Sequence, residues 1–328
     1  MATLTLAEAA DLATAALTRC RTSPENAAIV ARALVGAEAD GLKGHGMTRV
    51  PIYAAQAKRG KVDGFAQPRT EQPRPGLLVV DANLGFAYPA IEAALGPLPA
   101  LARHNGIAAA AIRRSHHCGA AGQPVERLAE AGLVALMVAN TPAAIAPWGG
   151  SHGVYGTNPV AFACPLPGRA PIVVDLSLSK GTRGNILAAK QRGERIPEGW
   201  ALDADGRPTT DPDAALAGTM IPAGDAKGTM LALMVEMLAA GLTGSNFATE
   251  ASSFLDAEGP PPGTGQLIVC FDPAAFGSDP ARFAVLAAAI ERQDGARLPG
   301  KRRRDARKRA AAAGLVLADA LVDEIARL

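Results

Sequence analysis

From Gly76 onward, short β-branched or apolar runs alternate with helical patterns, and this alternation constrains the fold more than any other feature. The patterns predict strands over residues 77–81, 107–112, 133–138, 160–164, 172–175 and 267–271. Helices are predicted over residues 89–103, 125–131 and 185–192, and a buried helix over 227–242. Such alternation is typical of an α/β protein with some parallel strand pairing.

The first residues of the chain have only helical patterns. Thr5 is placed to cap a helix that runs through Leu17. Ser23 and Pro24 then supply an N-cap and a proline at the first position of a second helix. A third helix is predicted over residues 49–59, and further helices from residue 279 to the end. Residues 193–224 are rich in Pro, Gly and Asp and predict a long ordered loop.

Composition excludes several classes of protein. Hydrophobic residues make up 48% of the 328, which allows a large core and excludes a wholly disordered chain. Lys and Arg total 33 against 31 Asp and Glu, so the basic excess of a nucleic-acid-binding protein is missing. The four cysteines form no Cys-x-x-Cys pair, which fits a reducing compartment. Without a signal peptide or membrane-spanning segment, we expect a cytoplasmic protein with no membrane partner.

A basic run covers residues 301–309, with seven cations and one acid. We interpret it as a solvated helical face or linker. The alternative is a role in binding nucleotide phosphates.

The five histidines are informative because imidazole exchanges protons near neutral pH. His45 lies between two glycines, which let a ligand approach the backbone closely. His116 and His117 follow the strand predicted over residues 107–112, at the end where open α/β sheets place ligands. From spacing alone, a histidine in a glycine turn is more often a cap than a catalyst. Adjacent residues on an extended segment point to opposite sides, so we expect no metal site at this pair.

The common nucleotide and nucleophile motifs are absent. No Gly-x-Gly-x-x-Gly follows a strand, and neither a Gly-Lys-Ser/Thr phosphate loop nor a Gly-x-Ser-x-Gly elbow occurs. Glycine-polar turns remain at residues 156–159, 177–181 and 224–228. The last turn opens a helix, where Lys227 either holds a phosphate beside unpaired N–H groups or faces solvent.

Six segments, taken in order, resemble the type-2 malate/L-lactate dehydrogenase family, also called the sulfolactate dehydrogenase-like family. They are residues 38–49 with Gly-His-Gly, 115–119 with Ser-His-His-Cys-Gly, 156–162 with Gly-Thr-Asn-Pro, 196–203, 208–212 and 227–228. The resemblance spans nearly the whole chain. It implies a non-Rossmann NAD(P)-binding α/β fold with a mixed sheet, and a homodimer. We expect a helical domain of residues 1–72, completed by 280–328, and a cofactor-binding domain of 73–279 with the insert 193–224.

The activity that this resemblance implies is hydride transfer between NADP or NAD and C2 of a small 2-oxo or 2-hydroxy carboxylate, of the sulfolactate, malate or lactate type. The alternative within the family is reduction of pyrroline-2-carboxylate or piperideine-2-carboxylate to proline or pipecolate. An alternative of another class is a catalytically silent, nucleotide-binding dimer.

The resemblance also assigns residues. His45 matches the family's proton donor, and His117 matches a second histidine that some members use as acid–base. Arg49 matches the arginine that pairs with the substrate carboxylate, a contact that two parallel hydrogen bonds would orient. The other implied substrate contacts are Gly44, Thr157 and Asn185. The implied cofactor contacts are His117, Gly119, Thr157, Asn158, Asp175, Ser177, Ser179, Lys227 and Gly228.

Three positions depart from the family pattern. Gly44 replaces the serine before the catalytic histidine, and Gln123 with Pro124 replaces the usual aromatic. Asn185 stands where cyclic imino-acid reductases tend to have aspartate and several hydroxy-acid dehydrogenases have lysine. Because the aspartate expected for imine chemistry is absent, we favour a hydroxy-acid substrate.

Overall fold

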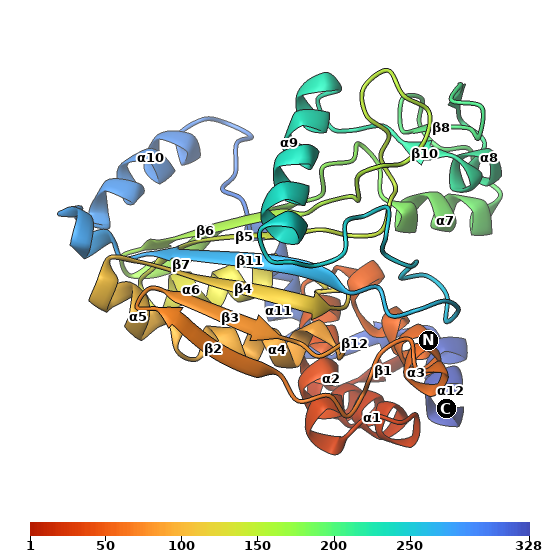
Figure 1. Ribbon diagram of the computed structural model, residues 1–328, viewed down its shortest axis with the longest axis horizontal. Coiled ribbons are helices and arrows are strands. Elements are labelled where there is room, and N and C mark those ends of the chain that lie inside the picture. The colour runs from red at the N-terminus through yellow and green to blue at the C-terminus, as the bar shows by residue number, and fades with distance from the viewer.

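The computed structural model describes residues 1–328 and centres on a seven-stranded mixed sheet (Figure 1). The strand order is β2 (Arg69–Arg74), β3 (Leu77–Asp81), β4 (Ile107–Ser115), β11 (Thr264–Phe271), β5 (Val134–Ala139), β6 (Val160–Leu166) and β7 (Arg169–Leu176). Only β3 and β4 pair in parallel, and the other neighbours are antiparallel. The predicted mixed sheet is therefore confirmed, although β2 carried no recognisable strand pattern.

Three helices cover one face of the sheet: α4 (Ala87–Leu95), α5 (Leu98–Asn105) and α6 (Gly122–Glu130). They enclose a core of 27 buried residues, built largely from alanine and aliphatic side chains. The single helix predicted over residues 89–103 is wrong, because the chain breaks into α4 and α5 at Gly96 and Pro97. Proline lacks the N–H that would continue the first helix, and it opens the second.

The opposite face of the sheet is partly open. Paired residues form an apolar row across it, from Val269 through Leu136 and Phe162 to Val174, and each is half-buried. Helix α9 (Ala226–Glu236) and its π-helical continuation Met237–Gly241 pack over one part of this face. The prediction of a buried helix over residues 227–242 is wrong, because only one side of α9 packs on the sheet and the other is exposed.

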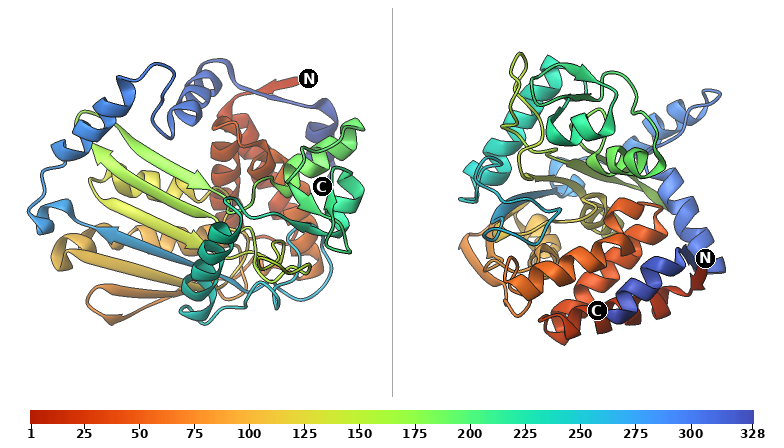
Figure 2. Two further views of the ribbon diagram at one scale, coloured as in Figure 1. Left: turned by 90° about the horizontal axis from the view of Figure 1, so that it is seen from above. Right: turned by 90° about the vertical axis from the view of Figure 1, so that its right-hand side faces the viewer.

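The N-terminal and C-terminal segments of the chain together form a helical part of the structure. Its helices are α1 (Leu6–Arg19), α2 (Pro24–Ala39), α3 (Val50–Arg59), α11 (Lys301–Ala313) and α12 (Asp319–Arg327). Thr5 and Ser23 cap α1 and α2 as predicted. Strand β1 (Ala2–Leu4) pairs antiparallel with β12 (Leu315–Leu317), which joins the first residues of the chain to its C-terminal part, and Figure 2 shows both ends of the chain on this helical part. A core of 22 buried residues fills this part.

Helix α10 (Ala281–Glu291) lies apart from that helical bundle (Figure 1). Its Ala287 packs with Leu166 of β6 and with Leu298, at the far end of the sheet. The 3₁₀ turn Pro273–Phe276 leads into it from β11.

A small lobe follows β7. It contains α7 (Arg183–Arg192), β8 (Ala201–Leu202), β9 (Pro208–Thr209), α8 (Pro212–Ala217) and β10 (Thr219–Met220). The three short strands form their own sheet over a core of eight buried residues. The loop predicted over residues 193–224 therefore contains regular structure, which two-residue strands are too short to reveal by their side-chain alternation. None of the helices in the chain combines the length and the apolar character needed to cross a membrane.

Candidate active site

Two histidines from distant parts of the chain, His45 and His117, lie next to each other. His45 ends the 3₁₀ turn Lys43–His45 after α2, and His117 follows the end of β4. Their imidazole rings stack with centroids 5.3 Å apart and planes 14° apart. The chain can turn after His117 because Gly119 has a φ of +69°, and a Cβ there would lie 2.5 Å from the Tyr88 hydroxyl. Glycine is therefore needed at position 119 by the backbone and by packing.

A tyrosine from α3 fixes the orientation of His117. The Tyr53 hydroxyl lies 2.5 Å from Nδ1 of His117 and 3.2 Å from the hydroxyl of Tyr88, and all three side chains are buried. Burial raises the pKa of Tyr53 to about 12, so the phenol keeps its proton at neutral pH. Because Tyr53 occupies Nδ1, Nε2 is the nitrogen of His117 left to exchange a proton with a ligand.

Both imidazoles are held in their neutral form. Burial, and then the positive charge of Arg49, lower the pKa of His45 to about 4. The same two causes, in the same order, hold the pKa of His117 well below its ordinary value. An anion that binds Arg49 would offset that charge and raise both pKa values. Both imidazoles would then bind a proton more readily than they do in the chain alone.

Arg49 ends the 3₁₀ turn Met47–Arg49, directly before α3. Its Nε donates to the carbonyl of Gly44 at 2.7 Å, and the guanidinium makes no ion pair within the chain. This leaves the terminal nitrogens available for a substrate carboxylate. At Gly44 itself, an added Cβ would meet nothing within 4 Å, so a serine would fit there.

The turn with Thr157 and Asn158 is held from behind by a buried carboxylate. The Asn158 side chain is fully buried, and its Nδ2 donates to Glu236 Oε1 at 2.9 Å and to the Ala232 carbonyl at 3.0 Å. Glu236 also accepts from the N–H of Gly156, and burial raises its pKa. The amide of Asn158 is thus engaged inside the protein, and Thr157 is the half-exposed member of the turn.

Polar groups gather where β7 ends. The hydroxyls of Ser177 and Ser179 lie 2.7 Å apart, and Ser179 donates to the carbonyl of Gly181. Close by in sequence, the carboxylate of Asp175 accepts from the N–H of Gly122 and from Arg303, each at 2.8 Å. Asp175 therefore joins β7, α6 and α11.

The N-terminus of α9 has no side-chain cap. Asp225 occupies the cap position without an N-cap bond, and its carboxylate pairs with Lys180. Lys227 is exposed in the first turn, and a Cβ at Gly228 would lie 2.0 Å from the Ala223 carbonyl. Uncapped N–H groups with a lysine beside them fit a phosphate.

The basic run forms α11, and much of it is not a solvated face. Arg307 pairs with Asp40 and Glu126, Arg303 pairs with Asp175, and Arg304 donates to a carbonyl of β7. Hydrogen bonding to Asp40 raises the pKa of Arg307. A cavity of about 610 Å³ opens between α11 and β7. Its lining includes Asp175, Gly300, Arg302, Arg303 and Arg309.

Asn185 is exposed on α7, in the small lobe. The cap of α7 is Thr182, whose Oγ1 accepts from the N–H of Asn185 at 3.1 Å. Thr182, and not Asn185, therefore caps this helix. His116 is also no ligand-facing group: its ring is buried among Tyr53, Phe86 and Phe254, and burial lowers its pKa to about 3.

Sequence reasoning missed Tyr53, Glu236 and Phe254. Tyr53 had a usable signal, since it follows Arg49 by one helical turn. The other two contact the site from distant segments, and no local pattern marks them.

Comparison with known proteins identifies the family. The family model described as malate/L-lactate dehydrogenase matches residues 4–326. The chain belongs to this family. Malate/L-lactate dehydrogenases are oxidoreductases, so the predicted enzyme class, family and non-Rossmann mixed-sheet fold are confirmed.

Individual members of the family differ in substrate. This chain is 53% identical to a (2R)-3-sulfolactate dehydrogenase (NADP(+)) from Chromohalobacter salexigens, over 98% of this chain and 96% of that protein. It is 40% identical to a Delta(1)-pyrroline-2-carboxylate/Delta(1)-piperideine-2-carboxylate reductase from Pseudomonas aeruginosa, over 100% and 99% of the two chains. The crystal structure of the delta1-piperideine-2-carboxylate reductase from Pseudomonas syringae superposes with a TM-score of 0.92 at 38% identity, covering 100% and 99%.

Proposed function

We propose that this malate/L-lactate dehydrogenase family member interconverts a small 2-oxo acid with a second anionic group, of the 3-sulfopyruvate type, and the corresponding 2-hydroxy acid. The observation that carries the proposal is the stacked His45–His117 pair beside the unpaired guanidinium of Arg49. The higher identity to the sulfolactate dehydrogenase than to the imino-acid reductases supports this choice of substrate.

In this proposal the chain's own residues bind, orient and protonate. Arg49 pairs with the C1 carboxylate and so places C2 and its oxygen against the histidines. The histidine pair delivers a proton to the C2 oxygen, and Tyr53 keeps the His117 ring in place. Bound NADPH supplies the hydride that adds to C2.

NADP suits the basic cavity between α11 and β7. Arg302, Arg303 and Arg309 line it, and only Arg303 is bound to a carboxylate. A 2′-phosphate is a dianion that such a surface stabilises. The uncapped start of α9, with Lys227, and the hydroxyls of Ser177 and Ser179 fit the remaining phosphates and ribose.

The reductase alternative needs an acid that stabilises a protonated imine. The position where cyclic imino-acid reductases tend to have aspartate does not supply one in this chain, because Asn185 is an amide. A screen with NADPH and NADH decides between the substrates. We expect 3-sulfopyruvate to oxidise NADPH faster than pyruvate, oxaloacetate, pyrroline-2-carboxylate or piperideine-2-carboxylate does. Faster turnover of either imine would favour the alternative, and cofactor binding without oxidation would indicate a silent binder.

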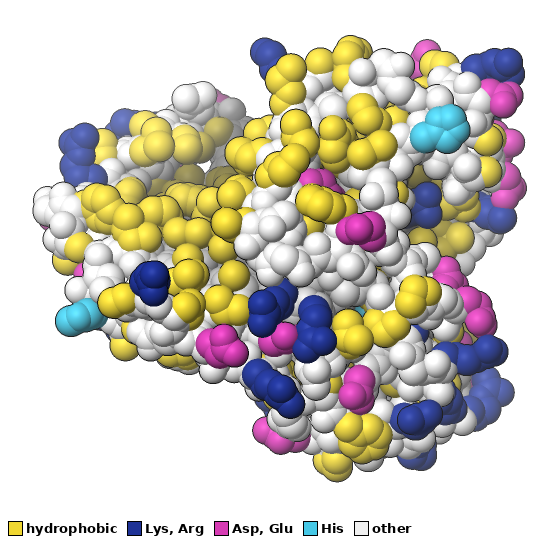
Figure 3. Space-filling model, in the orientation of Figure 1, with side chains coloured by type: hydrophobic (Ala, Val, Ile, Leu, Met, Phe, Trp, Pro, Cys, Tyr) yellow, Lys and Arg dark blue, Asp and Glu magenta, His cyan; other side chains and the backbone are white.

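We further propose a homodimer and a cytoplasmic location. One side of α9 exposes Met230, Leu231, Leu233, Met234 and Met237, each at least 40% exposed. Figure 3 shows these apolar side chains continuing onto the open face of the sheet. Apolar patches of this kind mark interfaces between subunits. Sedimentation should show a dimer that Met234→Glu dissociates. The location is supported by four cysteines that are all free and buried.

The predicted division into residues 1–72 completed by 280–328, and 73–279, also remains part of the proposal, with the change that α10 (Ala281–Glu291) belongs to the sheet, because its Ala287 packs with Leu166 of β6. Its support is that the helical part and the sheet have separate buried cores. The histidine pair then joins residues from both.

A further inference from the structure

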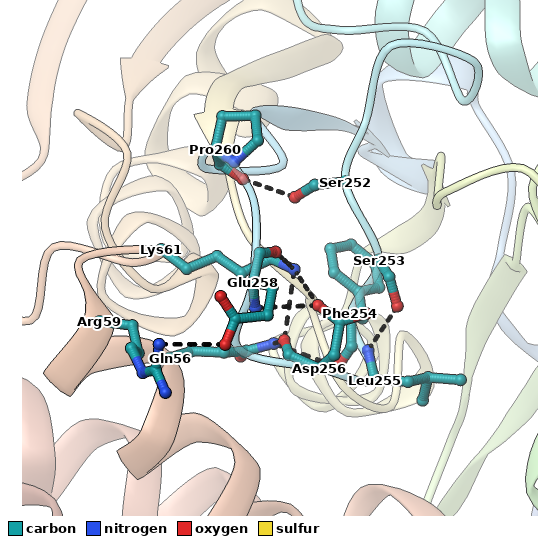
Figure 4. Close-up of polar contacts among 10 residues, drawn as sticks. All are labelled: Gln56, Arg59, Lys61, Ser252, Ser253, Phe254, Leu255, Asp256, Glu258 and Pro260. Carbon is teal, nitrogen blue, oxygen red and sulfur yellow. Dashed lines mark hydrogen bonds and ion pairs between the residues drawn. The ribbon is translucent and has the colours of Figure 1, made fainter.

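A segment without helix or strand, residues 252–260, contacts His116 and His117 through Phe254, and we call it the strap. Figure 4 shows its polar contacts. Its two ends are joined, because the Ser252 hydroxyl donates to the carbonyl of Pro260 at 2.6 Å. Inside the strap, the carboxylate of Asp256 accepts from the N–H of Glu258 at 3.0 Å. The strap is thus a closed loop, and its position depends on what binds it from outside.

Two buried side chains from the α3 segment bind the strap backbone. Gln56 donates from Nε2 to the carbonyls of Phe254 at 3.2 Å and Asp256 at 2.8 Å. The ammonium of Lys61 donates to the carbonyl of Asp256 at 3.2 Å, to its carboxylate at 2.8 Å and to the carbonyl of Glu258. Gln56 is 0% and Lys61 1% exposed, although lysine is almost never fully buried.

A buried ammonium is costly unless all its protons are bonded. Lys61 finds three acceptors, and all three belong to the strap. The energetic cost of this lysine is therefore offset only while the strap stays in place. This makes Lys61 and the strap a coupled unit, unlike the exposed pair of Arg59 with Glu258, in which both side chains lie in water.

What the strap presents to the site is Phe254. Its ring is 7% exposed and lies 5.1 Å from the ring of His117 and 5.4 Å from that of His116. The carbonyls bound by Gln56 and Lys61 belong to residues 254, 256 and 258, so the backbone is fixed at Phe254 itself and just after it. Phe254 excludes water from one side of His117.

The same helix fixes the other parts of the site. Arg49 immediately precedes α3, and Tyr53 and Gln56 lie on it. Gly60 ends it in the left-handed conformation, with a φ of +77°, and Lys61 follows. One rigid element therefore positions the carboxylate partner, the bond to His117 and the strap.

We propose that Gln56 and Lys61 are positioning residues for the reaction, which hold Phe254 against His117 through the strap and so keep this face of the histidine pair dry. The inference rests on the proposed function only in taking His117 as part of the proton-delivering pair.

The test measures His117 without substrate. We would record the pH titration of imidazole ¹⁵N signals in wild type, Lys61→Met, Phe254→Ala and, as matched control, Arg59→Ala. Burial holds the pKa of His117 low, so admitting water should raise it by about 1 unit or more in Lys61→Met and Phe254→Ala. Arg59→Ala removes only the exposed pair and should leave the titration unchanged.

Phe254→Ala separates positioning from charge, because it leaves the ammonium of Lys61 in place. A rise in Lys61→Met alone would show that the lysine acts by its charge, and no rise in either variant would show that the strap does not shield His117. Either result overturns the proposal. Should Lys61→Met fail to fold, Gln56→Leu releases the Phe254 carbonyl without leaving an unpaired charge, and the same criteria apply to it.

Kinetics give the second readout. With 3-sulfopyruvate as substrate, we expect kcat to fall about 10-fold in Lys61→Met and in Phe254→Ala, while the Kd for NADPH stays unchanged. Lys61→Arg, which keeps a positive charge, should have a kcat between those of Lys61→Met and the wild type. A pKa rise without any loss of kcat would overturn the positioning role. The wild type could fail to oxidise NADPH with any of the 2-oxo acids while the two variants still show the rise in the pKa of His117. That result would count against the proposed function and not against the role of the strap.

Discussion

Removing the Tyr53 hydroxyl tests how the site orients its histidine. Tyr53→Phe deletes the contacts to His117 Nδ1 and to the Tyr88 hydroxyl, and leaves both buried polar atoms without a partner. An unsatisfied buried group costs about 1–3 kcal/mol, so with two such groups the free energy of unfolding should fall by about 2–6 kcal/mol. The transition state loses a fixed imidazole as well. If that orientation contributes about 1.4–2.7 kcal/mol, kcat falls about 10- to 100-fold.

Tyr88→Phe is the matched control. It removes a hydroxyl that touches Tyr53 but not His117, so it should lower stability while kcat stays within about 3-fold of wild type. Urea denaturation and initial rates of NADPH oxidation, at saturating NADPH and 2-oxo acid, measure the two effects. Equal losses of kcat in both variants, or wild-type kcat in Tyr53→Phe, would refute the argument that Tyr53 orients His117.

Four further outcomes are expected. His45→Ala should lower kcat about 10²–10⁴-fold with cofactor affinity unchanged, and wild-type kcat would shift proton delivery to His117. Arg49→Lys should chiefly raise KM for the 2-oxo acid, because lysine cannot make the planar paired contact; unchanged KM and kcat would place the carboxylate elsewhere. Asn185→Asp should raise kcat/KM for pyrroline-2-carboxylate relative to a 2-oxo acid, and an unchanged ratio would end the idea that this position selects substrate. The free energy of unfolding should fall as the pH drops from about 6.5 toward 4, by about 1.4 kcal/mol per pH unit for each buried histidine, because the unfolded chain binds more protons than the folded one in this range. His116→Phe should make this pH dependence less steep in urea denaturation, and a slope equal to that of the wild type would contradict the prediction.

The strands and helix starts were predictable where local chemistry decides them. The run of residues 77–81 became β3 at those bounds, and the Ser23–Pro24 pair began α2 where expected. The break at Gly96–Pro97 was also visible in the sequence, but the apolar periodicity on both sides hid it. Exposure was harder to predict: α9 looks buried because it is apolar all round, and only the tertiary structure shows that one side is uncovered.

The candidate site was predictable through motifs and not through contacts. His45, Arg49 and His117 stood out because glycines and the family pattern surround them. The partners that orient them, Tyr53 and Phe254, carry no motif, because their contacts to His117 join segments that are far apart in the sequence. Long-range pairs of this kind depend on the fold as a whole.

The central claim is hydride transfer to C2 of a 2-oxo acid, and isotope transfer tests it most directly. The enzyme would be incubated with 3-sulfopyruvate and NADPH dideuterated at C4 of the nicotinamide, and the product examined by mass spectrometry and proton NMR. The account predicts 3-sulfolactate with one deuterium, located at C2, and no such product from Arg49→Ala at the same concentrations. Binding of NADPH without deuterium transfer to any of the 2-oxo acids would contradict it.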